Sequence, residues 1–227
     1  MTGRTDVIAI DGPAGSGKST VARGVADALG LEVLDTGAMY RAATLAVLEA
    51  GIDPGDADGA AAVARGNTID VGEPPGRVLL GDRDVTTEIR GPEVTAAVSA
   101  VSAHPAVRDV MVHHQRLWVE RRRGGVVEGR DIGTVVFPDA AVKVFLTASD
   151  EERARRRQRD EEAAARDTEL ARLRESLARR DALDSNRTTS PLRPADDAWV
   201  LDTTARTVDD VVAGIVERYR SVAGVGG

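Results

Sequence analysis

The sequence has no cysteine, only two lysines, and few aromatic residues, which make up 3% of the chain. Without cysteine, disulfides and thiolate metal sites are excluded, so any metal ion must be bound by oxygen or imidazole ligands, a set that suits Mg²⁺. No segment approaches the roughly 18 uninterrupted apolar residues that a membrane span requires. The first residues run directly into a strand-like segment without the apolar stretch of a signal peptide. We therefore expect a cytoplasmic protein with no membrane partner.

Basic side chains are outnumbered, with 30 Lys and Arg against 37 Asp and Glu and a formal net charge of -7. Domains that bind nucleic acids normally present a broad basic face, so this balance argues against a nucleic-acid partner. The two lysines are Lys18 and Lys143, and all other basic residues are arginine. A lysine at position 18 in so arginine-rich a chain suggests that a compact ammonium group is needed there.

Most of the chain alternates between strand and helix patterns, which is typical of an α/β fold with a parallel sheet. A run of short apolar segments predicts strands over 7–10, 32–34, 126–136, 142–146 and 198–202. Amphipathic patterns predict helices over 21–30, 35–51 and 208–219, and a helical stretch over 91–123 that is interrupted at Pro105. Between 53 and 90, an Ala-rich helix and three short strands indicate an inserted lobe.

The segment 149–180 is densely charged, and its apolar positions form one narrow stripe of Leu170, Leu173 and Leu177. A stripe of this width cannot build a core of its own. We expect a helical hairpin that is hinged over a site and acts as a lid.

Residues 12–19 match the phosphate-binding motif G-x-x-x-x-G-K-[ST], and they lie between a predicted strand and a predicted helix, as the motif requires. In this P-loop the glycines let backbone N–H groups point at phosphate oxygens, and the helix that follows adds its positive end. Lys18 is expected to reach the β and γ phosphates of ATP, and the Ser19 hydroxyl to bind Mg²⁺. The predicted ATP-binding residues are Gly12, Pro13, Ala14, Gly15, Ser16, Gly17, Lys18, Ser19 and Thr20.

A P-loop alone does not distinguish a kinase from a GTPase or a motor ATPase, because the same loop serves all three. The sequence has no N-K-x-D motif, and Asn67 and Asn186 are its only asparagines. A guanine-reading motif is therefore missing.

Seven blocks carry a resemblance to a known family: DGPAGSGKST, DTGAMYR, DVTTEIR, VSAVSAHPAVR, EGRDIGTVVFPDA, EERARRR and LDSNRTTSPLRPA. Through these blocks, which span almost the whole chain, it resembles the bacterial cytidylate kinases. The resemblance implies a single domain over 1–227, with a three-layer P-loop kinase core, a nucleoside-monophosphate-binding lobe inserted at 52–98, and a lid region at 149–187. It also implies Mg²⁺-dependent transfer of the γ-phosphoryl group of ATP to CMP or dCMP.

The resemblance assigns the reading of the base to Asp131, Arg108 and Ser99. Cytosine presents an amino donor at N4 and acceptors at N3 and O2, so an acceptor beside donors suits it. Uracil reverses the N3 and N4 pattern and would leave a carboxylate facing a carbonyl, which predicts discrimination between CMP and UMP.

The resemblance assigns the rest of the acceptor site and the catalytic groups as well. Arg41 and Arg130 resemble the guanidinium forks that hold the acceptor phosphate, a geometry that bonds two oxygens at once. Taken singly, such arginines are usually exposed charges of little energetic value, so the prediction rests on the ordered set. Thr36 and Tyr40 would line the same pocket; the family often has Ser in place of the first, so the hydroxyl is retained.

By the same resemblance, Arg180 and Asp184 would contact the ribose, and Arg187 would contact the phosphates. The predicted catalytic residues are Lys18, Arg130, Arg153 and Arg157.

The acceptor oxygen is already anionic near neutral pH, so no general base is required, and catalysis reduces to alignment and charge stabilisation. Two other functions stay open from the sequence. One is a kinase for another small acceptor, such as UMP, AMP or shikimate, and the other is a regulator that binds ATP without transferring phosphate. Nothing in the sequence suggests a dimerisation helix, so a monomer is expected.

Overall fold

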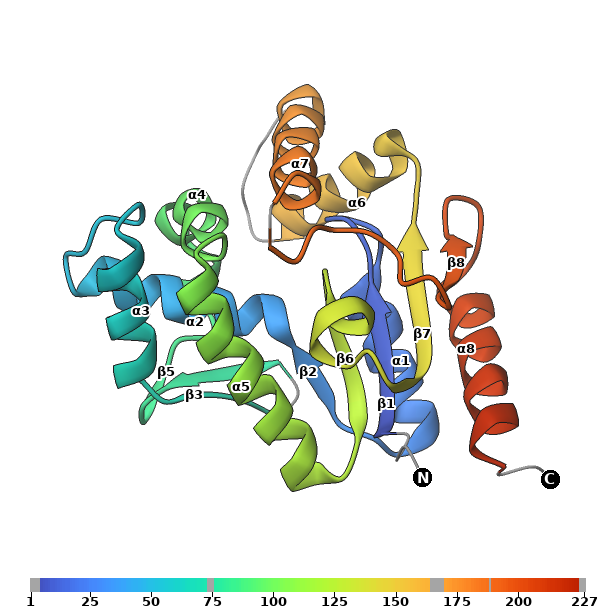
Figure 1. The fold of residues 1–227 in the computed structure, drawn as a ribbon. Helices are drawn as coiled ribbons and strands as arrows, with labels where there is room; N and C mark the ends of the chain where they lie inside the picture. The colour runs from blue at the N-terminus through green and yellow to red at the C-terminus, as the bar shows by residue number, and fades with distance from the viewer. Residues whose placement is uncertain (1–4, 73–75, 164–169, 188, 225–227) are drawn as a thin grey trace. The chain divides into compact units, whose positions relative to one another are not determined.

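The computed structural model describes residues 5–72, 76–163, 170–187 and 189–224 (Figure 1). The chain divides into two compact units. The first unit is Met1–Leu31 with Val126–Gly227, and the second unit is Glu32–Gly125. Within the described residues, no helix is long and apolar enough to cross a membrane.

The first unit is built on parallel strands whose order in the sheet is β6 (Gly125–Gly129), β1 (Thr5–Asp11), β7 (Ala140–Thr147) and β8 (Trp199–Asp202). Strand β7 pairs in parallel with both β1 and β8. The side chains from Val7 to Ile10 are fully buried, as expected for a strand covered on both faces. The predicted α/β fold with a central parallel sheet is confirmed.

Helices α1 (Lys18–Leu29) and α8 (Val208–Ala223) pack closely in the first unit. At Gly24 of α1, an added Cβ would lie 2.8 Å from a methyl group of Val212 of α8. Helix α1 ends at the predicted Gly30, which has a left-handed backbone conformation with φ of 65°. Helix α8 continues past the predicted end at 219 to Ala223.

The segment 132–136 differs from the sequence-based prediction, which extended a buried strand through it. Strand β6 ends at Gly129, and Ile132–Val136 form a short π-helix, η2. Its i to i+5 hydrogen bonds include Phe137 N to Ile132 O at 2.7 Å and Val136 N to Asp131 O at 3.2 Å. The β-branched residues favour a strand locally, but contacts with the end of β1 outweigh this preference.

Helices α6 (Asp150–Ala163) and α7 (Leu170–Ser185) correspond to the predicted hairpin. Part of the predicted lid region, residues 164–169, lies outside the described residues. Leu177 of the apolar stripe packs in one cluster with Ala154 of α6 and Ala14 of the P-loop, and Leu170 lies against it. The stripe therefore packs against the phosphate loop as well as between the two helices.

The second unit combines helices with a small antiparallel sheet. The helices are α2 (Thr36–Glu49), α3 (Ala57–Gly66), the short η1 (Glu88–Arg90), α4 (Pro92–Val101) and α5 (Pro105–Arg122). The sheet has the order β3 (Ile69–Gly72), β4 (Arg77–Leu80) and β5 (Arg83–Asp84), and β2 (Val33–Asp35) precedes α2. The predicted interruption at Pro105 is present, because proline takes the first position of α5, where no N–H is needed.

Candidate active site

The P-loop joins β1 to α1, and its backbone is packed too tightly for side chains at two glycines. A Cβ added at Gly12 would lie 2.2 Å from the carbonyl oxygen of Leu146. At Gly15, φ is 75°, and a Cβ would lie 2.9 Å from the carbonyl oxygen of Arg153. Glycine is therefore required at both positions, for space at the first and for space and conformation at the second.

Lys18, the first residue of α1, is only 8% exposed, and its Nζ donates a hydrogen bond to the carbonyl oxygen of Pro13 at 2.8 Å. Burial, followed by the positive charges of Arg130 and Arg180, lowers the pKa of Lys18 to about 7, although Glu128 opposes the shift. A nearby anion would favour the charged ammonium, and phosphate oxygens would supply this charge.

The loop residues fit a phosphate group. The Ser16 hydroxyl is fully buried, and among the described residues its oxygen has no hydrogen-bond partner. The backbone of the loop leaves no room for a Cβ at Gly12 or Gly15, and the N-terminus of α1 opens at Lys18. An ammonium, an unused hydroxyl and a helix N-terminus together suit a polyanion. Ser19 follows Lys18 and is partly exposed, so its hydroxyl could bind a metal ion beside the phosphates.

Arg130 connects the P-loop to a buried carboxylate. Its Nη1 donates to the carbonyl oxygen of Gly12 at 2.8 Å, and its Nε donates to Asp184 at 2.9 Å. Asp184 is 2% exposed and also accepts a hydrogen bond from Arg187. Burial alone would raise the pKa of Asp184, but the charges of Arg130 and Arg187 outweigh burial and lower it. Arg180 adds to this effect, so the structure brings four of the predicted acceptor-site residues together.

Asp131 follows Arg130 and precedes η2. Its side chain is buried, and its backbone has φ of −143° and ψ of 23°. Its carbonyl oxygen accepts hydrogen bonds from Val135 N at 2.9 Å and from Val136 N. The backbone of Asp131 is therefore held by the π-helix that follows it.

The two predicted lid arginines differ in their surroundings. Arg153 donates to the carbonyl oxygen of Ala14 at 3.0 Å, to Asp150 at 2.7 Å, and to Asp181. Its guanidinium is thus bound to the P-loop backbone and to two carboxylates. Arg157, one turn further along α6, is partly buried.

Arg156 was not predicted as a site residue, yet it contacts the P-loop. Its Nη1 donates to the carbonyl oxygen of Ser16 at 3.2 Å and to the Thr203 hydroxyl at 2.9 Å. The Thr203 hydroxyl also donates to Ser16 O, at 3.2 Å. In the sequence, Arg156 is one member of an arginine run, and its pairing with Glu152 at i,i+4 is typical of an exposed helix face, so no signal distinguished it.

The remaining predicted residues lie in the second unit, on α2, α4 and α5. The guanidinium of Arg108 lies over the ring of Tyr40, 5.4 Å from its centroid, and both side chains are buried. Arg41 donates to the Thr95 hydroxyl and to a backbone carbonyl of η1, each at 3.0 Å. Thr36 is the first residue of α2 and is buried, and Ser99 lies partly exposed on α4.

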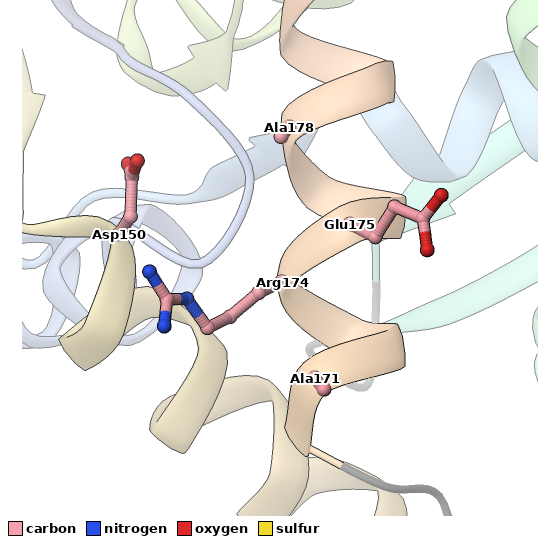
Figure 2. A pocket seen from close by; sticks show the side chains of 5 residues that line it. All are labelled: Asp150, Ala171, Arg174, Glu175 and Ala178. Carbon is pink, nitrogen blue, oxygen red and sulfur yellow. The ribbon is translucent and has the colours of Figure 1, made fainter.

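An open groove of about 330 Å³ lies between α6 and α7 and contains none of the predicted residues. Figure 2 shows Arg174 extending from α7 toward α6, whereas Glu175 points to the opposite side of α7. The groove is lined by Asp150, Ala171, Arg174, Glu175 and Ala178.

Known proteins resemble this chain in sequence and in fold. A model of the family described as Cytidylate kinase matches residues 8–221. The chain is 51% identical over 213 residues to a cytidylate kinase of Corynebacterium efficiens, covering 93% of each chain. It is 56% identical over 208 residues to a cytidylate kinase of Mycobacterium avium, covering 91% of each. In fold, it is similar to a crystal structure of an uncharacterized protein from Eubacterium ventriosum, with a TM-score of 0.50, 11% identity and coverage of 96% and 99%. With its P-loop and a family match over nearly its full length, the chain belongs to the cytidylate kinase family.

Proposed function

We propose that this chain is a cytidylate kinase that transfers the γ-phosphoryl group of ATP to CMP or dCMP, giving ADP and CDP or dCDP. Beside the family membership, one observation carries the proposal. The guanidinium of Arg130 donates one hydrogen bond to the carbonyl oxygen of Gly12, the first residue of the P-loop. It donates another to Asp184, a predicted acceptor-site residue. This side chain therefore connects the donor phosphate loop to the acceptor cluster.

The protein groups act by alignment and by charge. Lys18 and the loop N–H groups would hold the donor phosphates, and Arg130 would hold the acceptor phosphate against them. A Mg²⁺ ion bound near Ser19 would neutralise part of the phosphate charge. Arg153 and Arg157 would come from the lid toward the transferring group, while closure excludes water as a competing acceptor. No protein base is assigned, because the attacking oxygen is already anionic.

The acceptor site is proposed from the predicted set. Asp131, Arg108 and Ser99 would read the cytosine edge, and Thr36, Tyr40 and Arg41 would surround the acceptor phosphate. Arg180 and Asp184 would contact the ribose, and Arg187 the phosphates. The Arg130–Asp184–Arg187 cluster, in which the carboxylate is buried and both arginines are partly exposed, supports this, because its two cations share one carboxylate and retain positive charge for a phosphate.

The larger organisation is proposed in the same way. Residues 52–98 would form the nucleoside-monophosphate-binding lobe and residues 149–187 the lid. The cytoplasmic location and the monomeric state expected from the sequence also stay predictions.

An assay of ADP release tests the proposed function. Purified protein with ATP and Mg²⁺ is supplied in turn with CMP, dCMP, UMP, AMP or shikimate, and the release of ADP is coupled to a spectroscopic signal. CMP and dCMP are expected to give much higher kcat/KM than the other acceptors. A protein that binds ATP but releases no ADP with any acceptor would be a regulator, and preference for another acceptor would make it a different small-molecule kinase.

A further inference from the structure

Asp11, the last residue of β1, has a buried carboxylate that reaches across to a distant part of the chain. The side chain is 4% exposed. One carboxylate oxygen accepts a hydrogen bond from Ile132 N at 2.8 Å, and the other accepts one from Gly133 N at 2.7 Å. The two N–H groups belong to the first two residues of η2, so Asp11 caps this π-helix from another strand.

The cap matters because of what lies immediately before it. The first N–H groups of any helix have no acceptor inside the helix, so a buried helix start needs one from elsewhere. In η2 these groups follow directly after Arg130 and Asp131, and the carbonyl of Asp131 accepts from the next turn. Asp11 therefore fixes the direction in which the chain leaves Asp131.

A second link ties the same two segments together. Gly12, which follows Asp11, accepts a hydrogen bond from Arg130 through its carbonyl oxygen. The end of β1 thus holds the pair Arg130 and Asp131 at two points. The Asp11 side chain binds the N–H groups that follow Asp131, and the Gly12 carbonyl oxygen binds the Arg130 side chain.

The chemistry of the cap suggests more than a structural role. Burial raises the pKa of Asp11 to about 6, the two backbone hydrogen bonds partly offset this, and the neighbouring Asp131 charge raises it further. Burying the charged carboxylate of Asp11 therefore costs free energy, a cost that an uncharged capping side chain would not have. Here each N–H meets a different oxygen of the side chain, an arrangement that a carboxylate allows and an amide does not, because the amide nitrogen is a donor.

We propose that Asp11 is a positioning residue for the acceptor nucleotide, which acts by holding Arg130 and Asp131 in their binding geometry through the start of η2. The inference rests on the proposed function, because it presumes that Arg130 and Asp131 bind the acceptor. Both carboxylate oxygens of Asp11 accept from backbone N–H groups, so the proposal assigns it no direct contact with a nucleotide.

The test compares Asp11→Asn with the wild type in the ADP-release assay. The amide keeps the size of the side chain but turns one acceptor into a donor that faces an N–H group. We expect the KM for CMP to rise about tenfold, as for the loss of one good hydrogen bond, while the KM for ATP changes by less than about twofold. In a double variant with Asp131→Ala, the Asp11 substitution should raise the KM for CMP by less than it does alone, because the part of its effect that acts through Asp131 is already lost and only the part through Arg130 remains.

The controls separate this role from a loss of stability. Asp56→Asn is the matched control, because Asp56 also accepts a backbone N–H at a helix start, Gly59 N at 3.0 Å, but is exposed. Asparagine caps helices as well as aspartate does, so this variant should keep both KM values. If Asp11→Asn does not fold, Asp11→Ser takes its place.

If Asp11 had only a structural role, its substitution would lower the thermal midpoint and the fraction of active protein but leave both KM values unchanged. This outcome would overturn the proposal. Equal rises in the KM for ATP and for CMP, or additive effects in the double variant, would also overturn it. Absence of CMP-dependent ADP release from the wild type is a separate result, and it would refute the proposed function first.

Discussion

The guanidinium of Arg153 donates a hydrogen bond to the carbonyl oxygen of Ala14, at 3.0 Å. The N–H of Ala14 in turn donates to Asp181 at 3.3 Å, and Asp181 also pairs with Arg153. Both backbone groups of one P-loop residue are therefore bound by helices of the predicted lid, α6 through Arg153 and α7 through Asp181. Protein groups alone hold these helices against the loop in this structure.

Replacing Asp181 with Asn should loosen the lid. The buried Arg153 would lose one of its two carboxylate partners, which is expected to lower the free energy of unfolding by roughly 1 to 3 kcal/mol. Hydrogen exchange in α7 should become faster in the free protein, and CMP with a non-hydrolysable ATP analogue should restore protection. Glu151→Gln is the control, because its pair with Arg155 lies exposed on α6, the helix that carries Arg153, and should contribute little. Equal exchange in both variants would contradict the prediction.

Lys18→Met should abolish phosphoryl transfer and leave the fold intact. In the proposed mechanism the lysine acts on phosphates, and its Nζ donates a hydrogen bond to a loop carbonyl oxygen and not to a core group. Lys143→Met is a matched control, since Lys143 is the only other lysine and pairs with the exposed Asp197. Turnover by the ADP-release assay and circular dichroism should separate the two variants. Turnover near the wild-type rate in folded Lys18→Met would refute the P-loop assignment.

Asp131→Ala should raise the KM for CMP and narrow the preference for CMP over UMP. The N4 amino group of cytosine would lose its acceptor, which corresponds to about tenfold to a hundredfold in affinity for a charged hydrogen bond. Steady-state kinetics with both acceptors measures the effect. An equal change for CMP and UMP would mean that Asp131 does not read the base.

The stability of the protein should depend on pH through Asp11. Its pKa is raised by burial to about 6 from 3.8, with Asp131 adding to the shift and Lys18 opposing it. Between these values the folded state holds a proton that the unfolded state has released, so protonation of Asp11 stabilises the folded state. This contribution to the free energy of unfolding is complete below about pH 4 and is lost as the pH rises through 6. Urea titrations of wild type and Asp11→Asn at pH 4.5 and pH 7.5 isolate this group.

The free energy of unfolding of the wild type, relative to the variant, should be greater at the lower pH. A shift of this size corresponds to about 3 kcal/mol in full, of which roughly 2 kcal/mol falls between pH 4.5 and pH 7.5. A relative stability that stays constant or increases with pH would show that the pKa of Asp11 is not raised.

The sequence predicted those features that depend on neighbouring residues. The P-loop motif, the helix stop at Gly30 and the break at Pro105 each follow from the conformational limits of one residue, and the structure has all three. The π-helix was missed because its first N–H groups find their acceptor in Asp11, 121 residues away. A pattern of neighbouring residues contains no information about such a distant contact.

The same reason explains the omission of Arg156. Its partners Ser16 and Thr203 are 140 and 47 residues distant in the chain, and only the fold brings them together. The acceptor-site residues, by contrast, came from the resemblance to a family and not from local physics. Their spacing alone gives no hint that Arg130 and Arg187 meet around the buried Asp184.

The close approach of Gly24 to Val212 makes the residue sizes at these two positions interdependent. Alanine at 24 would favour helix α1 by about 1 kcal/mol if it were exposed, but here its methyl group would overlap a valine methyl. A smaller residue at 212 would leave a void that the alanine could then occupy. The two sites can therefore exchange volume only as a pair, and because α1 begins at Lys18, a misfit between them would be transmitted to the lysine of the P-loop.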